Sequence, residues 1–349
     1  MGEMSRHLIP HSRPFLGREE ERAVVRALRS GMIGAGEAVS RFEGDFARFL
    51  GGGVAVAVQT GSAALHLALL SLGVGPGDRV VLPSYCCAAV LNAVRYCGAE
   101  PVLADPDPAT ANLDPAGVRR RLSARTRAVI VPHLFGLPAP VREIRRLGVP
   151  VVEDCAMSLG AEGGLLGDVS VFSFYATKMM ATGHGGLVAT RDRRRAAVAR
   201  DLVDYDNRDD GRTRFNYRMS ALAAALGTAQ LRRLPGFVER RREIAARYRR
   251  ALGWGGAPGG HAYYRFTVRV PDVERFARFM ASRGVDCKRP VYRPLHRLLG
   301  LSPAGFPGAE ELHRTLASVP LYPALRPAEV ERVAAALRAC VDGGGRIRT

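Results

Sequence analysis

The chain has 349 residues, of which 47% are hydrophobic and 24% are charged. This length suffices for one large core or for two domains that share an interface, and the composition excludes bulk disorder. No apolar run reaches the roughly 20 residues of a membrane-spanning helix, and the N-terminus lacks the apolar core of a signal peptide. We therefore expect a cytoplasmic protein without a membrane partner.

The net charge of +18 comes largely from arginine, including the runs at 193–195 and 240–242. A solvated basic surface is the favoured explanation, and attraction of an anionic small substrate is the alternative. Nucleic-acid binding is disfavoured because the basic residues are dispersed along helical stretches without interleaved aromatic residues. The six cysteines show no CxxC spacing and no histidine–carboxylate group has metal-ligand spacing, so we expect reduced, buried thiols and no metal site.

In chain order, an irregular arm at 1–15 is followed by helical apolar spacing between residues 19 and 50. Short apolar strands then alternate with helices. The expected strands are 54–58, 79–82, 101–104, 128–131, 149–152, 169–174 and 186–190, and the helices among them include 63–72 and 88–96. This alternation predicts an α/β domain with a mostly parallel sheet, in which the last two strands are neighbours.

The second half of the chain predicts a smaller α+β unit. Ser220 caps an alanine-rich helix that runs toward Leu234, and Pro235 is expected to start a second helix at 237–252. A strand at 263–270 and helices at 273–283 and 327–341 follow. We expect an arm at 1–15, a large domain at 16–235 and a small C-terminal domain at 236–349, with a frayed tail at 343–349.

The functional prediction depends on Lys178, the only lysine before residue 288 in an arginine-rich chain. It follows the strand expected at 169–174 and precedes the glycine-rich stretch 183–186. A lone amine in such a loop suits a cofactor that forms a Schiff base with lysine. The alternative is a solvated surface charge, which the rarity of lysine and the apolar approach disfavour.

Three further features of the sequence fit the same chemistry. The segment Gly61-Ser62-Ala63 follows a strand and opens a helix, whose free backbone N–H groups form an anion site. Asp154 ends a strand, where its carboxylate could keep a pyridine nitrogen protonated, and Ser173 could donate to a phosphate. The alternatives are an ordinary serine N-cap, a strand-terminal acid and an outward-facing serine. Together with the lysine, these residues favour pyridoxal 5'-phosphate as the cofactor.

Six segments in this order carry a resemblance to a known family. They are TGSAALH at 60–66, GDRVVLPSY at 77–85, VED at 152–154, FSFYATK at 172–178, FNYRMS at 215–220 and YRPLH at 292–296. From about residue 9 to residue 337, the chain resembles the DegT/StrS-type sugar aminotransferases, which are fold-type-I pyridoxal phosphate enzymes. The resemblance implies a large cofactor-binding domain with a mostly parallel sheet and a smaller C-terminal α+β domain.

The resemblance also implies roles for the cofactor-binding residues. Lys178 would carry the cofactor and move the proton during transfer, while Asp154 would pair with the ring nitrogen. The phosphate would be held by Gly61 and Ser62 at the helix start and by Ser173.

Other implied roles concern the substrate and a second subunit. Asn216 would reach the phosphate bound by a neighbouring subunit, which implies a homodimer with shared active sites. Tyr292 and His296 lie in the segment that approaches the sugar in this family, and His184 could enter the site from the lysine loop.

Three positions depart from the family pattern. Cys87 stands where an aromatic residue usually stacks on the cofactor ring, and Met157 stands where a glutamine usually lies near its phenolic oxygen. His184 replaces an acid that is common between the glycines after the lysine. The losses are modest, because an aromatic contact contributes about 0.5–1.5 kcal/mol and a hydrogen bond about 1 kcal/mol. Separately, His133 follows the strand at 128–131 and could face the cofactor.

The leading functional prediction is a transaminase that moves an amino group, from L-glutamate, onto a keto sugar that is linked to a nucleotide. A keto cyclitol is an alternative acceptor. The alternative from another class is a regulatory or interaction protein that keeps the cofactor but has lost turnover through Cys87 and Met157. The dehydratase branch of the family is disfavoured, because a histidine replaces the lysine there and Lys178 is present here.

Overall fold

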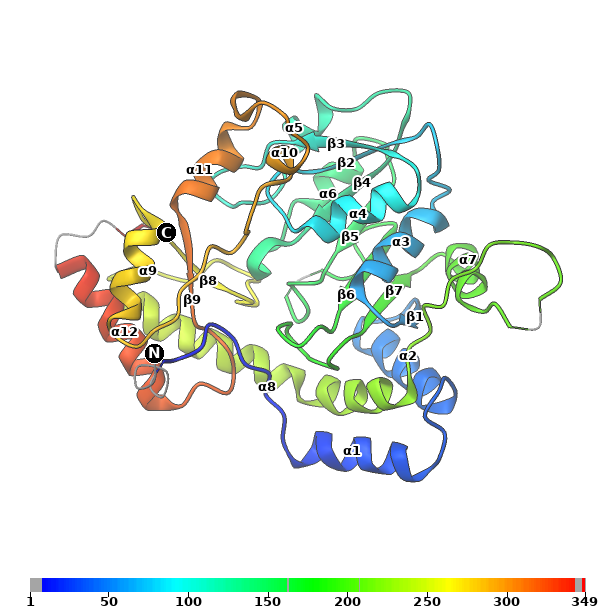
Figure 1. Cartoon of the computed structure of the whole chain (residues 1–349), viewed down its shortest axis with the longest axis horizontal. Helices are drawn as coiled ribbons and strands as arrows, with labels where there is room; N and C mark the ends of the chain where they lie inside the picture. The colour runs from blue at the N-terminus through cyan, green and yellow to red at the C-terminus, as the bar shows by residue number, and fades with distance from the viewer. Residues whose placement is uncertain (1–7, 162, 207, 343–346, 349) are drawn as a thin grey trace.

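A seven-stranded sheet forms the centre of the computed structural model, which describes residues 8–161, 163–206, 208–342 and 347–348. Its strands lie in the order β1-β7-β6-β5-β4-β2-β3 (Figure 1). They are β1 (Val54–Val58), β2 (Arg79–Pro83), β3 (Glu100–Ala104), β4 (Thr126–Pro132), β5 (Val151–Asp154), β6 (Val169–Ser173) and β7 (Gly186–Thr190). Only β7 runs against its neighbours, so the predicted mostly parallel sheet and the β6–β7 pairing are confirmed.

Different helices cover the two faces of this sheet, because side chains alternate along each strand. In β1, Val56 and Val58 face the apolar cluster that includes α3 (Gly61–Ser71), α4 (Ala88–Tyr96) and α7 (Arg193–Val203). Ala55 and Ala57 belong to the opposite cluster, with α2 (Glu37–Phe49) and the first half of α8 (Ala221–Ala251). The short helices α5 (Pro115–Arg119) and α6 (Val141–Arg145) cover the β2, β3 and β4 end of the sheet. Both faces are buried, as is usual for a largely parallel sheet.

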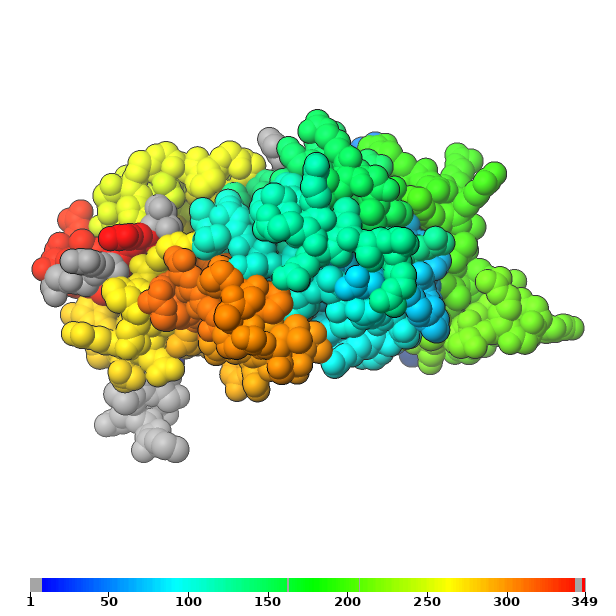
Figure 2. Space-filling view, turned by 90° about the horizontal axis from the view of Figure 1, so that it is seen from above, coloured from blue at the N-terminus to red at the C-terminus, as the bar shows by residue number. Residues whose placement is uncertain are grey.

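A smaller lobe is built on two antiparallel strands, β8 (Phe266–Arg269) and β9 (Leu316–Val319). They share a core with α9 (Val273–Ala281), α12 (Pro327–Asp342) and the second half of α8. Along the chain, α10 (Leu295–Leu298), η3 (Pro303–Gly305) and α11 (Pro307–Thr315) lie between α9 and β9. Figure 2 shows this segment in orange against the larger lobe. The carboxylate of Asp105, just after β3, accepts the N–H groups of Gly308 and Ala309 and so fixes the start of α11.

Helix α8 runs through Pro235 without a break, so the predicted helix end near Leu234 is wrong. A proline inside a helix costs about 3 kcal/mol, because it removes one backbone hydrogen bond and crowds the preceding turn. Burial offsets this cost on both sides of Pro235. Leu231 and Leu234 pack into the larger lobe, and Ile244 and Tyr248 pack into the smaller one. One continuous helix therefore joins the two cores, and the domain boundary at 235 stays a prediction.

The described part of the N-terminal arm is bonded to the smaller lobe. Ile9 is buried, its N–H donates to Gly284 and its carbonyl accepts from Asp286. The chain then reaches α1 (Arg18–Arg29), which packs on α8 (Figure 1). The first seven residues of the predicted arm and most of the predicted frayed tail lie outside the described residues. Among the helices described, none is long and apolar enough to cross a membrane.

The end of β5 is supported by Glu153, whose carboxylate is fully buried. It accepts hydrogen bonds from two side chains and three backbone groups. The donors are His133 Nε2, Ser170 Oγ and the N–H groups of Gly164, Leu166 and Gly167. Burial alone raises the pKa of Glu153, but these bonds, led by His133, outweigh it and lower the pKa to about 2. The network fixes the loop between β5 and β6, and with it the position of the next residue, Asp154.

We expect the substitution Glu153→Gln to lower the free energy of unfolding by about 2–4 kcal/mol, because a neutral amide cannot accept all of these donors. A lowered folded-state pKa contributes stability above the unfolded-state value, so this contribution should disappear as the pH falls from about 4.5 toward 2. Urea unfolding as a function of pH measures both effects. Glu143→Gln, at an exposed position of α6, is the matched control, and equal midpoints for the two variants would contradict the account.

Candidate functional site

The carboxyl ends of the parallel strands and the start of α3 meet around one pocket of about 340 Å³. Its lining residues are Thr60, Gly61, Ser62, Leu65, Cys87, Ala89, Asp154, Ala156, Val171, Phe172, Ser173, Tyr175, Lys178, His184 and Gly185. Seven of the residues singled out in the sequence are therefore brought together, although they come from five separate segments. A pocket at the carboxyl edge of a parallel sheet is where ligands of open α/β folds usually bind.

The start of α3 forms an anion cradle on one wall of this pocket. Thr60 caps the helix, since its hydroxyl accepts the N–H of Ala63 at 3.0 Å. The first N–H groups of a helix have no acceptor within the helix, so those of Gly61 and Ser62 are left to a ligand. The amide of Ala63, which the sequence also suggested as a cofactor contact, is instead used by the cap.

Gly61 is required here by the close approach of α3 to β6. A Cβ atom at this position would lie 2.8 Å from the Cβ and 3.0 Å from the Oγ of Ser173. Because glycine has no Cβ atom, the backbone N–H groups of Gly61 and Ser62 and the hydroxyls of Ser62 and Ser173 can all border the same part of the pocket. Such a set of donors matches a phosphate group, so the residues present fit the phosphate of pyridoxal 5'-phosphate.

Asp154, the last residue of β5, also lines the pocket, and only 6% of its surface is exposed. Its Oδ1 accepts the N–H of Ala156 at 2.9 Å. Burial raises the pKa of Asp154, and the Ala156 bond and the charge of Lys178 oppose that rise only in part. A cation placed against this carboxylate would remove the burial penalty, and a protonated ring nitrogen is such a cation.

Lys178 lies in the loop between β6 and β7. The loop is closed by backbone bonds from Ala176 to Gly183 and from Thr182 to Phe174, and the N–H of Lys178 donates to Tyr175. The ammonium group lies 5.3 Å from the ring centroid of Tyr264, which comes from the segment before β8. Burial raises the pKa of the Tyr264 phenol, but the charges of Lys178 and Arg265 outweigh it and bring the pKa to about 8.

The remaining predicted site residues lie outside this pocket. Met157 is partly buried and packs against the apolar clusters of the larger lobe. Asn216 is exposed, and its carbonyl accepts from Gln59 at 2.8 Å. Tyr292 is 92% exposed. At the pocket mouth, by contrast, the exposed ring of His184 lies 5.4 Å from that of Tyr175.

His296 is buried and bridges the two lobes. Its Nδ1 lies 2.6 Å from the Ser84 hydroxyl, just after β2, and its Nε2 lies 2.7 Å from Glu310 in α11. The N–H of Leu295 also donates to the carbonyl of Ser84. His296 therefore joins the end of β2 to α11 through hydrogen bonds and is not part of the pocket lining.

His133 likewise faces the protein interior rather than the pocket. Its Nδ1 accepts the N–H of Ala139 and its Nε2 donates to Glu153, so both ring nitrogens are engaged. Its nearest potential metal ligands, Glu153 and Cys155, are buried with it. Burial also raises the pKa of the Cys155 thiol well above its ordinary value. His133 and Glu153 therefore belong to the hydrogen-bonded network around the end of β5.

Sequence reasoning missed the contribution of the smaller lobe and the arm. Tyr264 and Arg265 precede β8, Arg241 lies in α8 and Arg13 lies in the arm, yet all four border the space beside Lys178. The only signals in the sequence were strand alternation at 263–270 and an arginine run at 240–242. Neither pattern indicates that these side chains converge on the lysine.

Comparison with known proteins gives the family. The model of the DegT/DnrJ/EryC1/StrS aminotransferase family matches residues 14–338. The chain is 34% identical to GDP-perosamine synthase of Caulobacter vibrioides, over 93% of this chain and 96% of that protein. It is also 34% identical to dTDP-4-dehydro-2,3,6-trideoxy-D-glucose 4-aminotransferase of Saccharopolyspora spinosa, over 94% and 96% of the two chains.

A solved structure agrees with this assignment. The aminotransferase TlmJ from Streptoalloteichus hindustanus is 37% identical and superposes with a TM-score of 0.90, covering 96% of this chain and 99% of that chain. The predictions of the fold and of an enzyme of the aminotransferase type are therefore confirmed. This chain belongs to the DegT/DnrJ/EryC1/StrS aminotransferase family.

Proposed function

We propose that this protein transfers an amino group onto a nucleotide-linked keto sugar, with pyridoxal 5'-phosphate bound at Lys178. The observation that carries the proposal is the convergence of a lysine, a buried acid and an anion cradle on one pocket. Relatives at 34% identity are named as a perosamine synthase and as a sugar 4-aminotransferase, which supports a sugar acceptor. L-glutamate is the proposed donor, and a keto cyclitol remains the alternative acceptor.

When bound, pyridoxal 5'-phosphate supplies an aldehyde that links to amines and a ring that withdraws electrons. The chain orients and polarises that group. The N–H groups of Gly61 and Ser62 would hold the phosphate, and the carboxylate of Asp154 would keep the ring nitrogen protonated. Cys87 and Ala89, at the start of α4, also line the pocket.

Lys178 has a second role, which is to move the proton between carbon atoms during transfer. A positioned side chain that accepts and returns a proton is the usual device for such a step. The lysine loop holds the amine at the lining of the pocket, 5.3 Å from the centroid of the Tyr264 ring.

We also propose that the active unit is a homodimer and that Asn216 acts in the partner's site. Its exposure and its absence from this chain's own pocket lining are compatible with that role. The loop that precedes it projects from the larger lobe beyond α7 (Figures 1 and 2). Sedimentation analysis measures the oligomeric state directly. A monomer that retains full turnover would contradict the proposed homodimer.

The test of function is turnover with L-glutamate and a panel of GDP- and dTDP-linked keto sugars. Formation of an amino sugar and 2-oxoglutarate, followed by mass spectrometry, supports the proposal. The alternative of a cofactor-binding regulatory protein predicts that L-glutamate never converts the cofactor to its amino form. Absorbance spectroscopy after mixing with L-glutamate alone separates the two.

We expect Lys178→Ala to abolish the absorption band of the covalently bound cofactor and to lower turnover at least about 10²–10⁴-fold, the usual contribution of a positioned base. Lys288→Ala is the matched control, because Lys288 is the chain's other lysine and is largely exposed. Absorbance spectra and steady-state rates of the two variants check this. An unchanged spectrum in Lys178→Ala would refute the assignment.

We expect Gly61→Ala to weaken cofactor binding about 5–100-fold, because the added methyl group collides with Ser173 at the phosphate cradle. Gly75→Ala is the control, since a Cβ atom at Gly75 meets open space. Titration of the apoprotein with pyridoxal 5'-phosphate gives both dissociation constants. If the two variants bind the cofactor equally well, phosphate does not bind at the start of α3.

A further inference from the structure

A second and smaller cavity lies on another side of Lys178. It has a volume of about 10 Å³, which is room for about one water-sized group. Four parts of the chain build it: the N-terminal arm, the lysine loop, α8, and the segments that precede β8 and follow β9. The residues that border it are Ser12, Arg13, Pro14, Phe15, Thr177, Lys178, Met179, Ala181, Gln230, Phe237, Arg241, Tyr264, Arg265, Leu321, Tyr322 and Pro323.

This cavity combines four cations with no acid among the described residues that border it. Besides Lys178, the cations are Arg13, Arg241 and Arg265. Across the described ranges, none of the four has a carboxylate partner in an ion pair, although many arginines of this chain do. Like charges that share a small, poorly hydrated space repel one another, so an anion bound here would be strongly favoured.

Arg241 is a buried cation with no ion-pair partner among the described residues. Only 4% of its surface is exposed. One terminal nitrogen donates to the carbonyls of Tyr263, Tyr264 and Leu321, whereas its Nε has no partner among the described residues. Burial lowers the pKa of this guanidinium to about 9. Buried charges are normally paired, and here the protein offers only neutral carbonyls.

Arg265 is held in place from two sides. One terminal nitrogen lies 3.1 Å from Nδ1 of His11, and the other donates to the hydroxyl of Tyr264 at 3.2 Å. His11 is buried, and its Nε2 lies 2.9 Å from Ser318 in β9. The guanidinium is therefore positioned before any ligand arrives, which lowers the entropic cost of binding an anion.

We propose that Arg13, Arg241 and Arg265 form a binding site for a carboxylate of the amino donor. The proposal rests on the proposed function, because it assumes that the donor amine reacts beside Lys178. In an amino acid, the carboxylate is attached to the carbon that bears this amine, so it must lie close to the lysine as well. The cofactor phosphate has its own cradle at α3, and a cavity of this size excludes a sugar ring.

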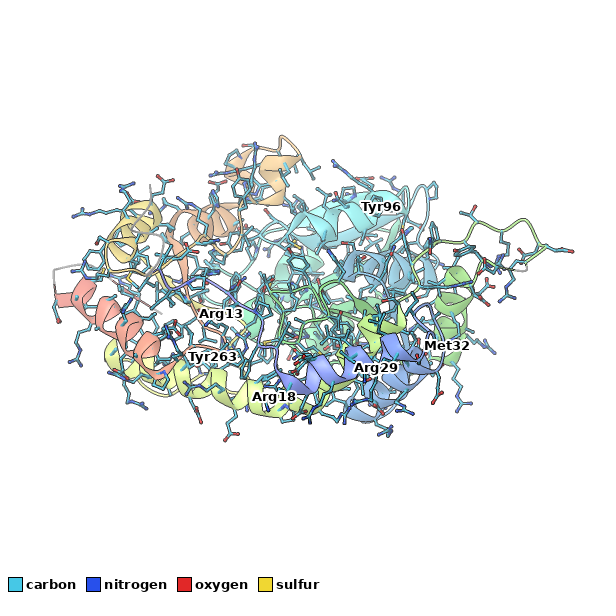
Figure 3. The ribbon with its side chains drawn as sticks, turned by 60° about the horizontal axis from the view of Figure 1, so that its bottom comes forward. Arg13, Arg18, Arg29, Met32, Tyr96 and Tyr263 are labelled. Carbon is cyan, nitrogen blue, oxygen red and sulfur yellow. The ribbon has the colours of Figure 1, made fainter. Side chains whose placement is uncertain are left out.

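The N-terminal arm is then part of the active site. Arg13 is exposed and is bonded to the carbonyl of Ala324 at 3.4 Å, so it can adjust to a ligand. Figure 3 shows it on the extended segment that leads to α1, whose two ends carry Arg18 and Arg29. The hydrogen bonds of Ile9 and His11 to the smaller lobe would hold the arm, and with it Arg13, beside the cavity.

Binding of glutarate, a dicarboxylate without an amine, to the cofactor-loaded enzyme tests the proposal by calorimetry. We expect Arg265→Ala to weaken glutarate binding about 10–100-fold, the usual effect of losing a charge-assisted hydrogen bond. Arg265→Lys should restore part of this affinity. Arg13→Ala should weaken glutarate binding less, because the Arg13 side chain is exposed. Arg18→Ala, five residues along the chain and also exposed, is the control and should leave it unchanged.

Equal affinity of Arg265→Ala and Arg18→Ala for glutarate would overturn the carboxylate site. The rates at which L-glutamate and L-alanine convert the bound cofactor to its amino form show which carboxylate of the donor binds here. If Arg265→Ala lowers the rate equally with both donors, the site binds the carboxylate next to the amine. If the rate falls only with L-glutamate, the site binds the distal carboxylate. Failure of the proposed function has a different signature, because the wild-type enzyme would then convert no cofactor with either donor.

Discussion

The close approach of α3 to the ends of β6 and β7 is the constraint on which the site depends. A Cβ atom at Gly186 would lie 2.3 Å from the carbonyl oxygen of Thr60, and one at Gly61 would collide with Ser173. These two glycines let a helix start lie directly against the strands that flank the lysine loop. The anion cradle and Lys178 are consequently fixed to the same pair of strands, so their separation does not depend on how the smaller lobe is placed.

Lys178 divides two environments of opposite character. On the side of the larger pocket lies Asp154, a buried carboxylate whose pKa is raised by burial. On the other side, Arg241 and Arg265 carry positive charge without an acid among the described residues that border the small cavity. A cofactor with a cationic ring nitrogen would satisfy the first side, and a donor carboxylate would satisfy the second. One transamination reaction would therefore supply a cation for Asp154 and an anion for the two arginines.

Local signals in the sequence were sufficient for most of the sheet and for choosing seven of the residues that line the pocket at its edge. The apolar runs of β1 and β7 have sharp polar or glycine boundaries, and both strands occur where the pattern predicted them. Patterns could not predict the unbroken α8, because burial on both sides of Pro235 is a tertiary effect. For the same reason the cation cavity was missed, since Arg13, Arg241 and Arg265 are far apart in the chain. His296 was assigned to the sugar by resemblance, whereas its hydrogen bonds to Ser84 and Glu310 arise only when the two lobes meet.

The central claim is that one particular amine carries the cofactor, and the composition of this chain makes it directly testable. The chain contains two lysines, Lys178 and Lys288. Reduction of the cofactor-loaded protein with borohydride, followed by peptide mass spectrometry, locates the permanent adduct. The account predicts a single phosphopyridoxyl group on the peptide that contains Lys178. An adduct on Lys288, or no adduct at all, would contradict it.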